Sequence, residues 1–271
     1  MLKVTNLTKT YAGNPQAAIE DINFEVNDGE IFGFIGPNGA GKSTTIKCIT
    51  GILNYEGGQI EIGGNNLRTN TLAAKRLMGY VSDNHIIYDK LTGIEFVNFM
   101  CDMFEVDAHT REERLAHYLD YFELAKAIGD PIKSYSHGMK QKLNIIGALI
   151  HNPKIWILDE PLLGLDPKST FNLKKLMKEH TAAGNSVFFS SHNLDIVEKI
   201  CDRVGIINHG KMIACCSISE LKTSGLQQSL EDLFLSITST SKASDGPSES
   251  AQNLSKNKKA ENIKELDKRE E

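Results

Sequence analysis

Short apolar runs separated by glycine-rich turns dominate the first two thirds of the chain. Ile31–Ile35, Ile155–Leu158 and Val187–Ser191 are mainly apolar, as expected of parallel strands covered on both faces. Ile22–Val26 instead alternates apolar and polar residues, as an antiparallel strand with one exposed face does. Ile60–Ile62 is a further short strand bounded by glycine pairs. The pattern predicts an α/β fold in which antiparallel strands accompany a parallel sheet.

Helical spacing replaces these runs from about Thr92 to Ile128. Apolar residues recur there every three or four positions, and we interpret them as core rather than as cofactor contacts. They include Ile94, Val97, Met100, Leu115, Tyr118, Leu119 and Phe122. Further along, apolar residues at 204–207 and 211–214 flank an Asn-His-Gly turn, which is the pattern of a hairpin.

The composition changes sharply near the end of the chain, at residues 239–271. From Thr240 to Glu271 there are seven Lys or Arg, seven Asp or Glu and only three large apolar residues. Such a segment buries too little surface to offset the entropy of ordering it. We therefore predict a polar tail that is disordered, or loosely helical from about Lys256.

Overall composition limits the function classes. The chain has 271 residues, of which 40% are hydrophobic, and a net charge of −5, which argues against a nucleic-acid partner. Five cysteines without a C-x-x-C pair indicate reduced thiols in a cytosolic protein. The start of the chain does not resemble a signal peptide, and the longest apolar run, Ile145–Ile150, is far shorter than the roughly 20 residues of a membrane span. If the protein serves a membrane, we expect it to do so through a partner.

A glycine-rich loop after the strand Ile31–Ile35 is the most informative motif. It fits G-x-x-x-x-G-K-[ST] and is followed by helical spacing from Thr45 to Leu53. Its glycines let backbone N–H groups turn toward a phosphate, and the helix start adds its dipole. A chance glycine turn is the alternative, but strand, loop and helix together predict a nucleoside triphosphate site. The loop comprises Gly36, Pro37, Asn38, Gly39, Ala40, Gly41, Lys42, Ser43 and Thr44.

Several side chains of the predicted site carry separate roles. Lys42 supplies charge to the outer phosphates, and the Ser43 hydroxyl is a Mg²⁺ ligand. Asp159 and Glu160 end an apolar strand, where Asp159 would hold Mg²⁺ through water and Glu160 would orient or deprotonate the attacking water. Two acids that merely cap a helix are the alternative. His192 follows another strand end and could reach a γ-phosphate, although a lone histidine is more often structural.

Two further segments extend this series. Leu163–Pro167 is a tight loop directly after the acid pair. Tyr135–Leu143 opens with a serine and a glycine before helical spacing, and so predicts a second helix start that contacts phosphate.

Taken together, these motifs resemble the ATP-binding subunit of an ATP-binding cassette (ABC) transporter, from Leu2 to about Thr238. Their order matches: an adenine-stacking aromatic at Tyr11, the phosphate loop, a signature serine at Ser136, the acid pair, the Gly-Leu-Asp loop and the switch histidine. Ser136 follows Lys42 by 94 residues and precedes Asp159 by 23. The resemblance implies a P-loop NTPase domain over 1–238, with a mixed central sheet, an antiparallel β subdomain and an α-helical subdomain inserted at about 92–145.

The same resemblance implies a Mg²⁺-dependent ATPase that works in pairs. Two ATP molecules lie between two such chains, and each contacts one chain's phosphate loop and the other chain's Ser136 and Gly138. ATP closes the pair and hydrolysis reopens it, a population shift driven by tighter binding to the closed state. The resemblance also implies a membrane-spanning permease partner, and hence a cytoplasmic protein held at the inner face of the cell membrane.

This chain departs from the family pattern at two places. The signature is Tyr-Ser-His-Gly-Met rather than Leu-Ser-Gly-Gly-Gln, although its serine and second glycine remain. The glutamine of the lid loop, a Mg²⁺ contact in the family, falls near Asp83 here. With Leu230–Phe234, these departures are similar to the ATPases of bacterial type-2 exporters of drugs or peptides, or of immunity systems.

Two other functions are open. A soluble ABC ATPase acting on nucleic acid or the ribosome usually carries two cassettes in one chain or a long coiled-coil insertion. Asp83 and Ser136 are only 53 residues apart, which leaves no room for a coiled coil. A regulatory or immunity protein with little turnover would not need the intact Lys42 and Glu160.

In the family, the lid loop and adjoining helices receive the permease, so the resemblance implies that the permease contacts the surface formed by about Asp83 to Phe104. That stretch contains four large apolar residues close together, and an exposed patch of this kind often marks a partner site. The alternative is that they pack beneath the helical subdomain. They are Ile86, Ile87, Tyr88 and Leu91.

Overall fold

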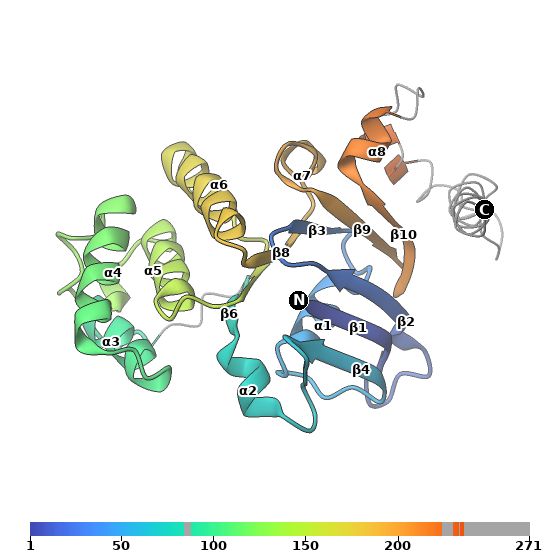
Figure 1. The fold of residues 1–271 in the computed structure, drawn as a ribbon, viewed down its shortest axis with the longest axis horizontal. Coiled ribbons are helices and arrows are strands. Elements are labelled where there is room, and N and C mark those ends of the chain that lie inside the picture. The colour runs from blue at the N-terminus through green and yellow to red at the C-terminus, as the bar shows by residue number, and fades with distance from the viewer. Residues whose placement is uncertain (84–87, 224–229, 233, 236–271) are drawn as a thin grey trace, which may run out of the picture.

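The computed structural model describes residues 1–83, 88–223, 230–232, 234 and 235, and it contains two sheets with helices around them (Figure 1). The predicted tail at 239–271 lies outside these residues. None of the helices within them is long and apolar enough to cross a bilayer.

The larger sheet has six strands in the order β10-β9-β3-β8-β7-β6. Every neighbouring pair is parallel except β9 and β10, so the sheet is mixed, as the resemblance implied. The three predicted apolar strands and the predicted hairpin are confirmed, whereas β6 was not predicted. The strands are β3 (Ile31–Ile35), β6 (Met78–Val81), β7 (Ile155–Asp159), β8 (Ser186–Ser191), β9 (Arg203–Asn208) and β10 (Lys211–Ser217).

The smaller sheet is antiparallel and has the order β2-β1-β4-β5. It confirms the antiparallel β subdomain. The strand β1 was not predicted, because register shifts near Asn6, whose φ is +48°, interrupt its alternation. The turn after β2 leads into β3 of the other sheet rather than forming a hairpin. The strands are β1 (Leu2–Thr10), β2 (Ala17–Val26), β4 (Gly57–Ile62) and β5 (Asn65–Asn66).

Helices α3, α4 and α5 gather at one side of the larger sheet, where the helical subdomain was predicted (Figure 1). The first helix, α1, begins at Lys42 and ends at Ile49, so both of its ends come earlier than the expected Thr45 and Leu53. It ends early because Gly51, two residues after Ile49, has φ +67°, which is not helical. Helix α5 continues past residue 145 to Leu149. The helices are α1 (Lys42–Ile49), α2 (Thr71–Arg76), α3 (Gly93–Met103), α4 (Ala108–Tyr121), the 3₁₀ turn η1 (Ile132–Ser134), α5 (His137–Leu149), α6 (Pro167–Ala182), α7 (Leu194–Ile200) and α8 (Ile218–Thr223).

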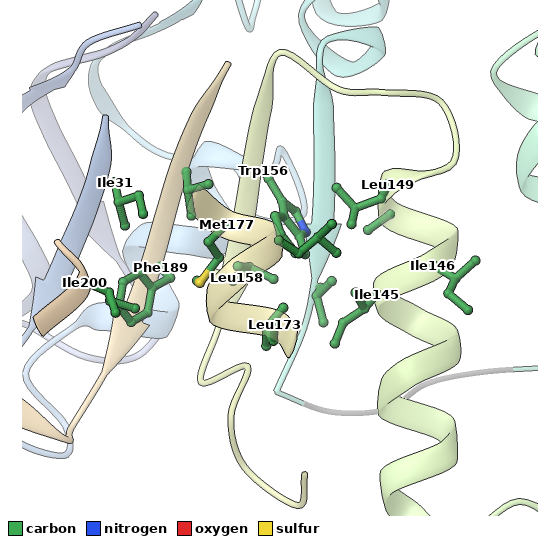
Figure 2. Close-up of a cluster of buried hydrophobic side chains, with 14 of the residues drawn as sticks. Ile31, Ile145, Ile146, Leu149, Trp156, Leu158, Leu173, Met177, Phe189 and Ile200 are labelled. Atoms are coloured by element: carbon green, nitrogen blue, oxygen red, sulfur yellow. The ribbon is translucent and has the colours of Figure 1, made fainter. Parts of the chain in front are cut away.

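The larger sheet is buried on both faces, which explains its continuous apolar runs. Along β7, Trp156 and Leu158 join one core cluster, whereas Ile155 and Ile157 join the other, since successive side chains point to opposite faces. Trp156 is fully buried among side chains of α5 and α6 (Figure 2). Its role is packing, as predicted.

Candidate functional site

The phosphate loop, His192, the acid pair and Asp83 come together because they lie at the carboxyl ends of adjacent strands of the larger sheet. The strands β3, β8, β7 and β6 are hydrogen-bonded neighbours in that order. They are followed by the phosphate loop, His192, the acid pair and Asp83, respectively. Parallel strands bring their carboxyl ends to one edge, which is where open α/β sheets bind ligands.

The phosphate loop needs its glycines for space and for backbone conformation. A Cβ on Gly36 would lie 2.3 Å from the carbonyl oxygen of Ile207 on β9. Gly41 has φ +108° directly before α1, a conformation that side chains rarely adopt. The unpaired N–H groups at the start of α1 therefore face an anion site.

Lys42 is buried within this loop. Its Nζ donates to the carbonyl oxygen of Gly36 at 2.6 Å and to that of Pro37 at 3.2 Å. Burial lowers the pKa of Lys42, and the Glu160 and Asp159 carboxylates oppose that shift. These bonds fix the ammonium group at the loop, where it is available to a phosphate.

Asp159 is fully buried, and one of its oxygens has no hydrogen-bond partner. Oδ1 accepts a hydrogen bond from Ser190 Oγ at 2.6 Å, whereas Oδ2 is unpaired. Burial raises the pKa of Asp159; Asp83 raises it further, and the Ser190 and Ser43 hydroxyls oppose the rise. A buried oxygen without a partner beside a second carboxylate and a hydroxyl fits a cation that prefers oxygen ligands.

Within the described part of the chain, no group of three or more His, Cys, Asp or Glu is arranged to hold a metal ion.

Glu160 and His192 are within hydrogen-bond distance of each other at the same edge. Glu160 Oε2 lies 2.9 Å from His192 Nδ1. The backbone of Glu160 has φ +48°, a costly conformation for a non-glycine residue, and its N–H donates to Ser190 Oγ at 3.0 Å. Ser190 thus holds both acids, a role that we did not predict from sequence.

A cleft of about 490 Å³ opens over the phosphate loop. Asp83 and Glu160 line it together with the loop, which brings the predicted lid-loop residue and proton acceptor to one cavity. Tyr11 lies beside the loop, 42% exposed, with its hydroxyl 3.2 Å from Thr44 Oγ1. The cleft is lined by Asn14, Ala18, Asn38, Gly39, Gly41, Lys42, Ser43, Thr44, Asp83 and Glu160.

Ser136 and Gly138 line neither this cleft nor the neighbouring cavity next to the loop. Ser136 is exposed at the start of α5, where its Oγ accepts a hydrogen bond from Met139 N at 3.3 Å. The signature residues therefore form a separate helix start, apart from the chain's own phosphate loop.

The start of α5 is fixed to the loop that follows the acid pair. Gln141 Nε2 donates to the carbonyl oxygen of Pro161 at 2.9 Å, and Lys142 Nζ lies 3.2 Å from Asp166 Oδ2. Hydrogen bonds from Ser169 and the Lys142 ammonium hold the pKa of Asp166 well below its usual range. These contacts link the signature helix to the loop next to Glu160.

The predicted permease surface is described only in part, since Ile86 and Ile87 lie outside the described residues. Tyr88 is 61% exposed and meets Phe99 of α3 edge to face, with ring centroids 5.9 Å apart. Met103, on the same helix, is also exposed, whereas Leu91 packs against the core. Tyr88, Phe99 and Met103 are called the α3 patch below.

Comparisons with known proteins agree with this geometry. A sequence profile of the family described as "ABC transporter" matches residues 19–163, which include the phosphate loop, Ser136 and the acid pair. The linearmycin resistance ATP-binding protein LnrL of Bacillus subtilis (strain 168) is 37% identical over 221 residues, or 82% of this chain and 70% of that protein. The bacitracin transport ATP-binding protein BcrA of Bacillus licheniformis is 35% identical over 223 residues, or 82% and 71% of the two chains. A solved structure of the ATP-binding subunit of an ABC transporter has a TM-score of 0.83 at 32% identity, covering 88% of this chain and 99% of that one.

Proposed function

This chain belongs to the ABC transporter family and is an ATP-hydrolysing subunit, and we propose that Lys42, Asp159, Glu160 and His192 carry the hydrolysis. The observation that carries this proposal is the pairing of Glu160 Oε2 with His192 Nδ1 at 2.9 Å, at a cleft that Lys42 also lines. Glu160 would accept a proton from the attacking water, and His192 would hold Glu160 in place.

Ser43 and Asp159 would hold Mg²⁺, with Asp83 beside them. When bound there, Mg²⁺ would supply positive charge that neutralises the phosphates. The unpaired Oδ2 of Asp159 supports this assignment. Asp83 lines the cleft and raises the pKa of Asp159, and these two observations support a role for Asp83 toward the ion or its water.

Ser136 and Gly138 would serve a second copy of the chain rather than their own cleft. They are separated from the phosphate loop within one chain, yet they form a helix start suited to phosphate. Tyr11, whose hydroxyl lies 3.2 Å from Oγ1 of the loop residue Thr44, would stack on adenine. A pair of chains would therefore enclose two ATP molecules, each held from both sides.

The transported cargo would leave the cell. The relatives' names, linearmycin resistance and bacitracin transport, support an exporter of antibiotic-like molecules. The chain would lie in the cytoplasm, peripheral to the inner face of the membrane through its permease. The net charge of −5 gives no support for a nucleic-acid partner.

Replacing Lys42 by alanine tests the nucleotide site. Hydrogen bonds to charged groups contribute about 1.5–3 kcal/mol, so we expect ATP to bind roughly 10–100-fold more weakly. Titration of a fluorescent ATP analogue and phosphate release would measure the loss. Lys47→Ala, on the same helix but outside the cleft, is the matched control. Unchanged binding by Lys42→Ala would reject the assigned phosphate contact.

The α3 patch supplies a test of the permease contact. Tyr88→Asp should weaken capture of the membrane subunit about 30-fold, since a buried aromatic anchor contributes about 2 kcal/mol or more. Its melting temperature and ATPase rate should stay as in wild type. Phe171→Asp, at an equally exposed aromatic on α6, should capture the subunit normally. Detergent extraction with a tagged chain measures capture, and unfolding of Tyr88→Asp would show that this patch is core instead.

A further inference from the structure

Two side chains near the end of the described chain, Leu230 and Phe234, pack against the body of the protein. Leu230 is 1% exposed and belongs to the main core cluster. Phe234, four residues later, is partly buried against the same cluster, whereas Glu231 and Leu235 are exposed. Residues four apart share one face of a helix, so Leu230 and Phe234 form one docking face.

Phe234 reaches a second cavity, of about 220 Å³, beside the phosphate loop. One wall of the cavity is the start of the phosphate loop, and another is the chain around His192. Asn38 lines both this cavity and the nucleotide cleft, so the two spaces share a wall. The cavity is lined by Gly36, Pro37, Asn38, Ser191, His192, Leu194 and Phe234.

His192 and Leu194 both line this cavity together with Phe234. The His192 ring is 64% exposed, and Glu160 Oε2 lies 2.9 Å from its Nδ1. The neighbouring backbone is held locally, because Ser191 Oγ accepts a hydrogen bond from Asn193 N at 3.0 Å and Asn193 caps α7.

We infer that Phe234 is a positioning residue for ATP hydrolysis. Its ring forms part of the wall that the start of the phosphate loop and the His192 segment share around this cavity, and through that wall it would limit how far the two segments can move. It lies outside the nucleotide cleft, so it acts through Asn38 and His192 rather than on ATP. The inference rests on the hydrolytic role proposed for Glu160 and His192.

Phe234→Ala tests this role. A misplacement of about 1 Å at a catalytic group lowers rates by about 10²-fold, so we expect kcat to fall by about 10–100-fold while KM for ATP stays within about twofold. Phe234→Leu, which keeps an apolar wall, should recover most of the rate. Leu235→Ala, at the exposed neighbour, is the matched control and should behave as wild type. A raised KM with a lowered melting temperature and no recovery in Phe234→Leu would show a merely structural residue and overturn the inference.

A double-mutant cycle with His192→Ala separates this inference from the proposed function. If Phe234 acts through His192, the double variant should have a kcat within about twofold of that of the His192→Ala variant. Losses that multiply in the double variant would overturn the inference. Wild-type turnover by His192→Ala would instead count against the role proposed for His192, whereas wild-type turnover by Phe234→Ala alone would overturn only the positioning role.

Discussion

Replacing Glu160 by glutamine should lower ATP hydrolysis by about 10²–10⁴-fold while ATP still binds. The amide keeps the size of the side chain and its place beside His192, but it does not accept a proton from water. Glu160 does not hold the phosphate loop, whose contacts come from Lys42 and the helix start. Phosphate release under single-turnover conditions, with ATP binding measured in parallel, gives both quantities.

Glu179→Gln, at an exposed carboxylate on α6, is the matched control for this substitution. The substitution removes a carboxylate that does not line the nucleotide cleft. The variant should therefore hydrolyse ATP at the wild-type rate. Hydrolysis by Glu160→Gln at the wild-type rate would remove Glu160 from its role as proton acceptor.

Ser136→Arg should also abolish most hydrolysis, although Ser136 lies outside the chain's own cleft. Removing one preorganised donor from a developing charge costs about 10²–10³-fold in rate, and the bulk of arginine adds a barrier to closure of the pair. ATP affinity of the single chain should be unchanged. Ser134→Arg, two residues earlier and also exposed, is the control. A normal rate for Ser136→Arg would contradict a contact with the second copy's nucleotide.

Mixing two inactive variants extends this test. In a pair formed by Ser136→Arg and Lys42→Ala chains, one site combines a wild-type phosphate loop with a wild-type signature, and the other site carries both defects. The mixture should therefore recover activity that neither variant has alone. Failure to recover activity, with mixed pairs demonstrated by crosslinking, would count against sites shared between two chains.

Local patterns predicted the parts of this protein whose chemistry is continuous in sequence. The phosphate loop was recognised because strand, glycines and helix follow one another directly. The strand β7 was recognised because both of its faces are covered, so that Ile155 and Trp156 are equally buried. The strand β1 was missed because its bulges break the alternation that identifies a strand.

Long-range packing explains the residues that sequence did not predict. Ser190 is hydrogen-bonded to Asp159 and to Glu160, which lie 31 and 30 residues earlier in the chain. In the sequence Ser190 is only a small polar residue at the end of a strand, and nothing around it indicates these contacts. Phe234 and the start of the phosphate loop line one cavity although almost 200 residues separate them in sequence. No periodic pattern in the sequence indicates this proximity, because it depends on how the last helices pack against the sheet.

Sedimentation of the Glu160→Gln chain with and without ATP tests the central claim, that ATP joins two copies through Lys42 of one and Ser136 of the other. Because this variant binds ATP and does not cleave it, the closed pair should persist. We predict a monomer without nucleotide and a dimer with ATP, and a monomer again when Ser136→Arg is added. A chain that remains monomeric at high concentration with saturating ATP would contradict the account.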